Sequence, residues 1–263
     1  MGLGTNRDRG AEIAYEAIAP AYDDFTAHHK YEALMEELLP ALEQHGLAGH
    51  RLLDVGCGTG KSFLPMLSRG WAVTACDVSP AMVARAREKV GDSVRLEVAD
   101  MRDLPVFGEF DLVWPLVDAV NYLLDRDELK AALAGMRDNL AASGVLLFDV
   151  STLLAYRSFF ATSEVIEQDG ARLVRRGFTS ADAPSGSVWE ARFAVEGGAK
   201  MIEPHLHRQR HFPELDMLEA LRASGLEVLD VAGQHVDGIG LQRPLNESEH
   251  TKAVYIARRS GAD

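Results

Sequence analysis

The sequence has few cysteines, a deficit of positive charge and no long apolar stretch, and each shortage excludes a class of protein. Two cysteines, Cys57 and Cys76, are too few for a disulfide-stabilised secreted scaffold. No apolar run reaches the roughly 20 residues that a membrane-spanning helix needs. Lysine and arginine total 27 against 40 acidic residues, and the formal net charge of −13 argues against nucleic acid or anionic membranes as partners. We therefore expect a cytoplasmic protein that acts on a small molecule.

What is present is an ordinary globular composition. The chain has 263 residues, of which 47% are hydrophobic and 25% are charged. A chain of this length buries one full core, so we expect either one domain or one domain with a small appendage.

The most informative stretch is Leu52–Gly60, an apolar run that ends in three alternate glycines before a helix-compatible segment. A strand that turns sharply into a helix N-terminus is typical of a nucleotide site, because glycine lets the backbone approach a ligand and free N–H groups point outward. The dinucleotide fingerprint requires a glycine where Lys61 stands, and the phosphate-binding P-loop requires one where Val55 stands. The third candidate, D-x-G-x-G-x-G, is matched at every fixed position by Asp54, Gly56, Gly58 and Gly60.

The charge of Asp54 decides between these sites. A carboxylate about 4 Å from a phosphate costs roughly 4 kcal/mol at an effective dielectric constant near 20. The same carboxylate favours a ligand that carries an ammonium group. S-adenosylmethionine (SAM) has an ammonium, a sulfonium and one carboxylate, and no phosphate. The charge argument therefore favours SAM over a phosphorylated nucleotide, and a plain glycine turn without a ligand is the remaining alternative.

At this point the sequence resembles the class I SAM-dependent methyltransferases, over roughly residues 48–150 and again from residue 213. The resemblance implies an α/β, Rossmann-like fold. In that fold a seven-stranded, mostly parallel sheet has helices on both faces, and we expect a small antiparallel β insertion after the fifth strand. The implied cofactor is SAM.

Acidic residues end or follow three successive expected strands. The strands are Arg51–Val55, Trp71–Cys76 and Val94–Val98, and the acidic residues are Asp54, Asp77 and Asp100. Open α/β sheets bind ligands at the carboxyl edge of their strands, so the three carboxylates converge on one site. Asp77 stands where a carboxylate accepts both ribose hydroxyls of a nucleoside.

The resemblance also implies roles for individual residues in binding SAM. The Asp100 carboxylate would accept from the adenine amino group, and the Met101 backbone N–H would donate to a ring nitrogen. Met82, with Val78 beside it, would pack on adenine; its alternative role is in the core. The other residues implied by the resemblance lie over the methionine moiety or under the sulfonium: Tyr22, Tyr31, Leu116, Val117 and Tyr122.

Further along the chain the pattern changes from alternating strands and helices to antiparallel strands. We expect a fourth strand at Phe110–Trp114, a helix at Asp127–Ala142 and a fifth strand at Val145–Asp149. Short alternating segments then run from Ser163 to His211, with turns at Asp169-Gly170, Pro184-Ser185-Gly186 and Gly197-Gly198, so three or four antiparallel strands are expected. A helix at Leu215–Ala223 and strands at Leu226–Val231 and Lys252–Ala257 would close the main sheet with a reversed pair.

The expected organisation has three parts. Residues 1–47 form an N-terminal helical lid or substrate segment, residues 48–157 and 212–263 form the SAM-binding α/β domain, and residues 158–211 form the inserted antiparallel subdomain. Residues 1–11 are expected to be disordered, and the aromatic segment after them is either a helix packed on the domain or a lid over the substrate.

Four residues are candidates for positioning the substrate or accepting its proton: Tyr22, Asn121, His205 and His207. Strand alternation places His205 and His207 on one face with His211, and Glu203 lies close enough in sequence to complete a metal site. Two histidines at this spacing on one strand are a weak signal, so we predict no metal. His28 and His29 are interpreted as solvated or structural.

These observations predict a SAM-dependent methyltransferase that acts on a small molecule, most simply an amine of secondary metabolism, by in-line displacement. Positioning supplies roughly 7–11 kcal/mol in such reactions, so a strong base is optional. An amine with a lysine-like pKa must first lose a proton at pH 7, at a cost of about 4–5 kcal/mol. An O-methyltransferase, a non-catalytic SAM-binding protein and, third, a dehydrogenase are the alternatives, and the oligomeric state is left open.

Overall fold

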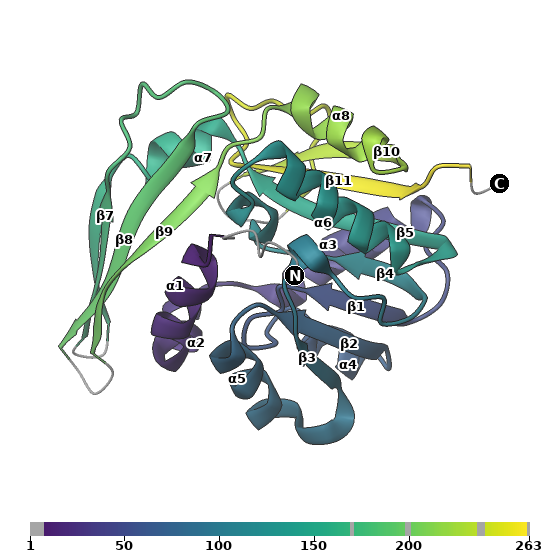
Figure 1. The fold of residues 1–263 in the computed structure, drawn as a ribbon, viewed down its shortest axis with the longest axis horizontal. Helices are drawn as coiled ribbons and strands as arrows, with labels where there is room; N and C mark the ends of the chain where they lie inside the picture. Colours follow the sequence, from purple (N-terminus) through teal and green to yellow (C-terminus); the bar gives the residue numbers. More distant parts are fainter. Residues whose placement is uncertain (1–7, 169–170, 198–200, 236–239, 262–263) are drawn as a thin grey trace, which may run out of the picture.

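The computed structural model describes residues 8–168, 171–197, 201–235 and 240–261. They form a seven-stranded sheet in the order β10-β11-β5-β4-β1-β2-β3 and a separate four-stranded sheet (Figure 1). The strands of the larger sheet are β1 (Arg51–Val55), β2 (Ala72–Asp77), β3 (Arg95–Val98), β4 (Phe110–Trp114), β5 (Leu140–Ser151), β10 (Leu226–Gln234) and β11 (Lys252–Arg259). The seven-stranded fold with its antiparallel insertion is the one predicted from the sequence.

The direction of the strands creates a crevice beside β1. Strands β2 and β4 pair in parallel with its two edges, and the chain proceeds outward through β2 and β3 before it returns to β4. Ligands of open α/β sheets bind at such a switch point, beyond the carboxyl ends of the strands. Strand β11 is antiparallel to both β5 and β10, so β11 alone is reversed and β10 runs with the other strands. The expected reversed pair is correct for β11 only.

Helices cover both faces of the large sheet. One face packs against α3 (Tyr31–Gln44), α4 (Leu64–Ser68) and α5 (Pro80–Val90), and the other packs against α6 (Arg126–Asp138) and α8 (Glu214–Ala223). Every residue of β4 is buried, as expected for a strand covered on both faces, and its one charged residue, Asp111, accepts from the Arg51 guanidinium at 2.8 Å. The spacing of Leu34, Leu38 and Leu42 predicts the buried stripe of α3, and burying each leucine fully contributes about 1.5–3 kcal/mol.

The largest differences from the expected boundaries are at the end of α6 and the start of β5. The helix expected to reach Ala142 ends at Asp138, because the Asn139 side chain accepts from the Phe107 backbone N–H and donates to the carbonyls of Pro105 and Gly135. The small residues after it belong to β5. Gly144 is needed there, since a Cβ at this position would lie 2.5 Å from the carbonyl oxygen of Phe110.

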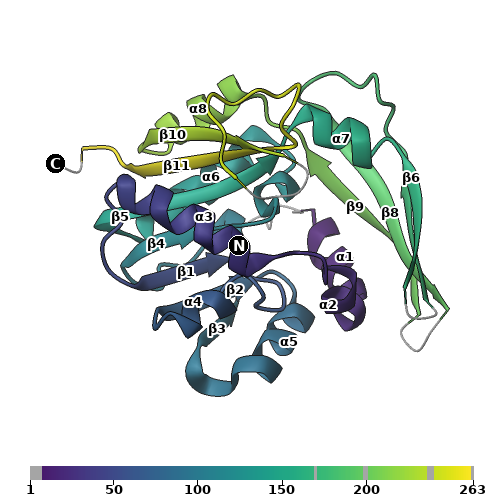
Figure 2. The same cartoon turned by 180° about the vertical axis from the view of Figure 1, so that it is seen from behind.

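The N-terminal segment is helical and lies between the two sheets. It consists of α1 (Gly10–Ile18), the 3₁₀ turn η1 (Ala19–Ala21) and α2 (Tyr22–Phe25). Figures 1 and 2 both show α1 and α2 between the four-stranded sheet and the α5 side of the large sheet. Of the segment expected to be disordered, residues 1–7 lie outside the described residues, and the helix already begins at Gly10.

The four-stranded sheet extends from one side of the large sheet. Its strands are β6 (Ser163–Gln168), β7 (Ala171–Gly177), β8 (Val188–Gly197) and β9 (Ile202–Arg210), all antiparallel to their neighbours. The expected turns at Asp169-Gly170 and after Gly197 fall on residues outside the described ranges. A helix that was not expected, α7 (Leu153–Phe159), precedes the sheet, and Thr152 caps it. The proposed division into parts at residues 157 and 211 stays a prediction.

Three short 3₁₀ turns complete the described secondary structure: η2 (Gly91–Ser93), η3 (Met101–Asp103) and η4 (Ala119–Tyr122). Among the helices of the described ranges, none combines the length and the apolar character needed to span a bilayer.

Candidate functional site

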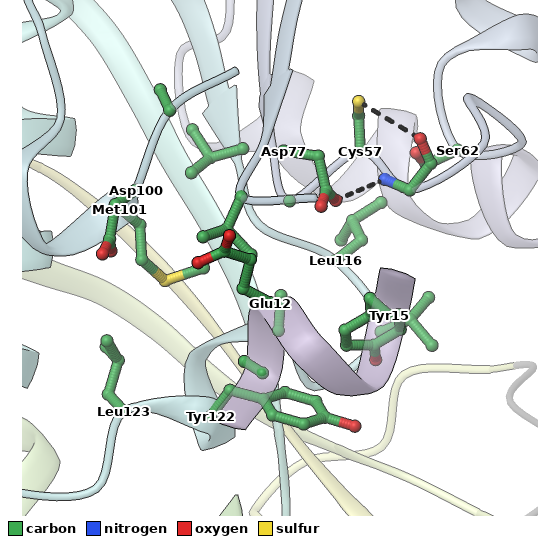
Figure 3. Close-up of a pocket in the computed structure, with 18 of the residues that line it drawn as sticks. Glu12, Tyr15, Cys57, Ser62, Asp77, Asp100, Met101, Leu116, Tyr122 and Leu123 are labelled. Carbon is green, nitrogen blue, oxygen red and sulfur yellow. Dashed lines mark hydrogen bonds between the residues drawn. The ribbon is translucent and has the colours of Figure 1, made fainter. Parts of the chain in front are cut away.

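A cavity lies at the carboxyl ends of β1, β2 and β4, and α1 lines the side of it that faces away from these strands (Figure 3). Glu12 and Tyr15 reach into it from α1, opposite Asp77 and Met101. Most of the residues expected to bind the cofactor line this cavity: Tyr22, Tyr31, Gly56, Gly58, Asp77, Val78, Asp100, Met101, Leu116, Val117 and Tyr122. Three others do not line it: Asp54, Gly60 and Met82. The expected residues that line the cavity therefore come from six separate stretches of the sequence.

The three glycines of the turn have different roles. All three have positive φ angles, +75° at Gly56, +54° at Gly58 and +86° at Gly60, which favour glycine. Gly56 and Gly58 line the cavity, as a close approach of backbone to ligand requires. A Cβ at Gly60 would instead lie 2.6 Å from the ring of the buried Phe63. The third glycine therefore serves the turn and its packing, and a direct contact with the cofactor stays a prediction.

Asp77 is held between the glycine turn and the start of α5. Its carboxylate accepts from the backbone N–H groups of Gly58 at 2.8 Å and Ser79 at 2.9 Å (Figure 3 shows the first bond). Ser79 is the expected N-cap of α5, and its hydroxyl accepts from the Met82 N–H. Burial raises the pKa of Asp77 to about 6. The carboxylate is thus fixed at the cavity wall, where it could accept the hydroxyls of a ribose.

Asp54 lies beneath the turn with 1% of its surface exposed. The Ser62 hydroxyl donates to its Oδ2 at 2.5 Å, while Oδ1 has no hydrogen-bond partner among the described residues. Burial raises the pKa of Asp54 to about 7, against the opposing effect of Ser62 and Trp114. A buried carboxylate without a full set of donors is costly unless a cation or donor approaches it. This arrangement fits a ligand with an ammonium group close to the turn, as SAM has.

Asp100 has a strong partner that the sequence did not reveal. The Arg102 guanidinium binds both of its carboxylate oxygens, with the shortest contact at 2.7 Å, and also donates to Glu128 at 2.9 Å. Arg102 is missed because an arginine two residues after the strand end belongs to no motif. Asp100 and Met101 both line the cavity, and their contacts with adenine stay predictions.

The loop after β4 is strained and held by a buried ion pair. Val117 and Asp118 have φ angles of +60° and +52°, which are unfavourable for residues with a Cβ. Asp149 of β5 accepts both of their backbone N–H groups, at 2.6 Å and 3.0 Å. Lys252 of β11 donates to Asp149 at 2.5 Å and to Asp118 at 3.2 Å. Burial lowers the pKa of Lys252, but these two carboxylates together raise it above its ordinary value.

Aromatic side chains form the wall between the cavity and the four-stranded sheet. The Tyr15 ring lies edge-on to Tyr22 at 6.0 Å and to Tyr122 at 5.2 Å, measured between ring centroids. The Tyr122 hydroxyl is 2.7 Å from Nδ1 of His207. Tyr15 was not among the expected site residues. Its spacing from Tyr22, seven residues or two helical turns, is the signal that points to a shared face.

His205 and His207 are buried and do not line the cavity. Burial lowers the pKa of His207 to about 3 and also lowers the pKa of His205, so both imidazoles are neutral at pH 7. His211 is buried as well, and its Nδ1 accepts from the Gly186 N–H. His207 meets the cavity wall through Tyr122 and through the Tyr15 ring, 5.6 Å away between centroids, and a direct role of either histidine in proton transfer stays a prediction.

Asn121 and Met82 are buried among protein groups. The Asn121 amide donates to the Arg210 carbonyl at 2.8 Å and accepts from the Ser151 N–H at 2.9 Å, so both ends are used by backbone. This geometry favours a structural role for Asn121 over the expected catalytic one. Met82 is fully buried in a cluster with Ile18 and Ala21 of the N-terminal segment, and Val78 alone of the expected adenine-packing pair lines the cavity.

Polar contacts fasten the N-terminal segment over the glycine turn. Glu16 accepts from the Ser79 hydroxyl and from the Ala81 N–H, each at 2.8 Å. Asp23 accepts from the Thr59 hydroxyl at 2.5 Å and pairs with Lys89 at 2.7 Å. Since these contacts join residues 36 to 66 positions apart, no local motif reveals them. The helix and lid interpretations of this segment are therefore compatible, because the helices themselves cover the cavity.

Comparison with known proteins supplies the family. The methyltransferase-domain family profile matches residues 52–144. A provisionally named methyltransferase of Geobacillus sp. (strain WCH70) is 30% identical over 94% of this chain and 100% of its own length. The dTDP-3-amino-3,4,6-trideoxy-alpha-D-glucopyranose N,N-dimethyltransferase of Streptomyces venezuelae is 29% identical over 67% of this chain and 75% of its own. The structure of a sugar N-methyltransferase from Streptoalloteichus sp covers 99% of both chains at 26% identity, with a TM-score of 0.68.

Proposed function

The chain belongs to the SAM-dependent methyltransferases, and from this premise we propose that it transfers a methyl group to the nitrogen of a small amine. The observation that carries the proposal is the similarity over 99% of both chains to a sugar N-methyltransferase. That span includes the four-stranded sheet and the N-terminal segment, the two parts of the chain outside the shared α/β framework. A second, shorter similarity is to an enzyme that dimethylates an amino sugar.

SAM supplies an activated methyl group on a sulfonium, which is a good leaving group. The residues that would hold it are those of the cavity: Gly56 and Gly58 along its backbone side, Asp77 at the ribose, and Met101 near adenine. Asp54 and Ser62 would stabilise its ammonium group from below the turn. We propose in addition that Tyr31 and the loop at Leu116 and Val117 lie against the methionine and sulfonium end.

The protein's contribution to catalysis would be position and the exclusion of water. Methyl transfer to nitrogen is an in-line displacement, for which proximity and orientation supply about 7–11 kcal/mol. The N-terminal segment closes the cavity, and four tyrosine side chains line it: Tyr15, Tyr22, Tyr31 and Tyr122. Burial of the amine against these tyrosine rings and away from water would disfavour its protonated form, and would thereby make its lone pair available.

Tyr22, His205 and His207 remain candidates for a role in substrate positioning. Tyr22 lines the cavity next to Gly58, whose Cβ, if present, would lie 3.6 Å from its ring. His207 would act by orienting the Tyr122 hydroxyl. In this arrangement the histidine side chain orients the Tyr122 hydroxyl, and Tyr122 in turn faces the substrate.

A methyl-transfer experiment tests the proposal. Purified protein is incubated with SAM carrying a labelled methyl group and a panel of amino sugars, simple amines, sugars and phenols, and the products are identified by mass spectrometry. Label on nitrogen is expected. Label on oxygen alone would show an O-methyltransferase, and tight SAM binding without transfer to any compound would show a non-catalytic binding protein. The Asp77→Ala variant should lose SAM binding, whereas Asp92→Ala, at an exposed position of η2, should keep it.

We propose further that the partners are restricted to small molecules and that the protein works in the cytoplasm. The formal net charge of −13 disfavours binding to nucleic acid. Cys57 and Cys76 are both free and buried, which suits a reducing compartment.

A further inference from the structure

A second cavity, of about 170 Å³, lies beside the cofactor cavity. The two cavities share three lining residues, Tyr31, Leu116 and Val117. The remaining walls of the second cavity come from residues 28–30, from α3, and from the ends of β5, β10 and β11. None of the described residues of the four-stranded sheet lines it. His205 and His207 of that sheet are among the residues expected to position the substrate, so this cavity lies in a different place.

The walls of the second cavity divide into an apolar floor and a polar lining. Four aliphatic side chains make the floor: Leu34, Leu38, Leu147 and Val254. The polar lining consists of Asp149, Lys252 and the ring of His29, together with His28, Lys30 and Gln234. Asp149 and Lys252 are paired with each other at 2.5 Å, so they bring dipoles and hydrogen-bonding groups without a net charge. A volume of this size is close to the roughly 150 Å³ of a cavity that encloses one six-membered ring.

The position of the second cavity matches what in-line displacement requires. The attacking atom must approach the methyl carbon from the side opposite the sulfur, at about 3–3.5 Å. The cofactor cavity lies over β1 and β2, and the second cavity lies over β5, β10 and β11, on the other side of the switch point. The shared residues Leu116 and Val117 come from the loop that we place against the sulfonium. The methyl group would therefore face the residues that the two cavities share.

We propose that the second cavity is the acceptor site, that it takes a primary or secondary amine on a ring-sized apolar body, and that His29 accepts a hydrogen bond from the amine N–H. This inference rests on the proposed N-methyltransferase function and adds the location and chemistry of its substrate site. The nitrogen lone pair forms the bond to the methyl carbon, and the electron pair of the broken carbon–sulfur bond goes to sulfur. The proton already on nitrogen stays there, and the product leaves as the methylated ammonium ion.

His29 is suited to this role by its surroundings. Its ring lies edge-on to Tyr31 at 5.9 Å and to His28 at 4.4 Å, measured between centroids. The charged groups that act on it are Lys61 and Lys252, which disfavour its protonation, and Asp149, which favours it. Burial, the largest influence, and its neighbours lower the pKa of His29 to about 4, so the ring is a neutral hydrogen-bond acceptor at pH 7.

A binding experiment tests the site without knowledge of the natural substrate. Cyclohexylamine, a ring-sized primary amine, is titrated by calorimetry at pH 9 into protein saturated with S-adenosylhomocysteine. The wild type should bind it saturably. Leu34→Trp, which fills the apolar floor, should weaken binding at least tenfold, and His29→Phe at least fivefold, while His29→Asn, which keeps an acceptor, should recover part of the loss. Leu215→Trp on α8, where the leucine is 75% exposed, is the matched control and should bind as the wild type does.

The outcomes separate this inference from the proposed function. Absence of saturable binding to the wild type, or equal binding by wild type and Leu34→Trp, overturns the acceptor site. Each variant must bind S-adenosylhomocysteine within twofold of the wild type, which shows that its fold and cofactor cavity are intact. If the amine panel is methylated but Leu34→Trp leaves the KM for the amine unchanged, the site is wrong and the activity stands. If cyclohexylamine binds as expected but no amine is methylated, the site stands and the N-methyltransferase proposal fails.

Discussion

The backbone N–H of Val117 donates a 2.6 Å hydrogen bond to Oδ1 of Asp149, from the loop after β4 to the end of β5. Val117 has a φ of +60°, a conformation that a β-branched residue rarely adopts. Strained backbone of this kind persists only where the surroundings impose it, and it clusters at functional sites. Val117 lines both cavities, so Asp149 fixes the residue that separates the cofactor from the proposed acceptor.

Asp149→Asn should destabilise the protein by about 3 kcal/mol, because one partner of a buried ion pair is lost and Lys252 keeps only Asp118. Urea denaturation at pH 7 measures the loss. Asp127→Asn is the control: its side chain is 95% exposed, and a change within about 0.5 kcal/mol is expected. Equal stability of the two variants would show that Asp149 does not restrain the loop.

SAM should bind more tightly as the pH rises from 5.5 to 7.5. The pKa of Asp54 is about 7 in the folded protein, well above the ordinary value of 3.8. A cationic ligand prefers the ionised carboxylate and so lowers its pKa, and binding releases a proton below pH 7. We expect the Kd to fall about tenfold over these two pH units, measured by calorimetry. In Asp54→Asn the change of Kd with pH should be smaller, because only Asp77, whose pKa is about 6, still contributes to it.

The raised pKa of Asp54 also makes the stability of the protein without SAM depend on pH. This dependence has the opposite sign to that of a salt-bridged carboxylate, whose pKa is lowered. Between pH 4 and 7 the folded protein holds the Asp54 proton more tightly than the unfolded chain does. The free energy of unfolding should therefore decrease as the pH rises through this window. Urea denaturation of wild type and Asp54→Asn at pH 5 and pH 7.5 measures it, and a wild type that gains stability relative to the variant at the higher pH would contradict the raised pKa.

Tyr122 and His207 should act as a unit, because the tyrosine hydroxyl lies 2.7 Å from Nδ1 of the histidine. Tyr122→Phe and His207→Phe should each lower kcat/KM, and the double variant should lose about 1 kcal/mol less than the sum of the two losses. Additive losses would show that they act separately. Since the pKa of His207 is about 3, the activity of the wild type should show no ionisation of this residue between pH 5 and 9.

What the sequence predicts well depends on local chemistry. Asp54 and Asp77 are placed correctly because each stands at the end of a strand that its own apolar residues define, and α5 begins as expected because Ser79 caps it and Pro80 follows. The four-stranded sheet is predicted because its segments alternate and turn residues separate them. In each case the information lies within about ten residues of the element.

What the sequence does not predict depends on contacts between distant segments. Lys252 meets Asp118 and Asp149 across 134 and 103 positions, and no spacing rule links them. The second cavity likewise has walls from residues 28 to 254, so its location appears only in three dimensions. His205 and His207 were expected to face the substrate because alternation gives a face but does not say what covers it; α1 and its Tyr15 ring cover His207.

Asp23→Ala should loosen the N-terminal segment over the cofactor. The variant loses the hydrogen bond from Thr59 and the ion pair with Lys89, which together contribute about 1 kcal/mol because the side chain of Asp23 is 43% exposed. SAM should therefore dissociate about fivefold faster, which stopped-flow fluorescence measures. Glu37→Ala, at an exposed position of α3, is the control and should leave the rate unchanged. An unchanged rate in Asp23→Ala would show that the segment does not control release.

Gly60→Ala and Gly46→Ala distinguish two reasons why a position requires glycine: a positive φ angle and a lack of space for a Cβ. Both positions have similar φ angles, +86° and +90°, so alanine is strained at each by about 1–2 kcal/mol. At Gly46 the new Cβ meets nothing within 4 Å, whereas at Gly60 it would lie 2.6 Å from the ring of Phe63, which is fully buried and cannot move aside. Gly60→Ala should therefore lose about 1–3 kcal/mol more in urea denaturation than Gly46→Ala. Equal losses would mean that the third glycine is required for its backbone conformation alone, and that the turn has room for a side chain against Phe63.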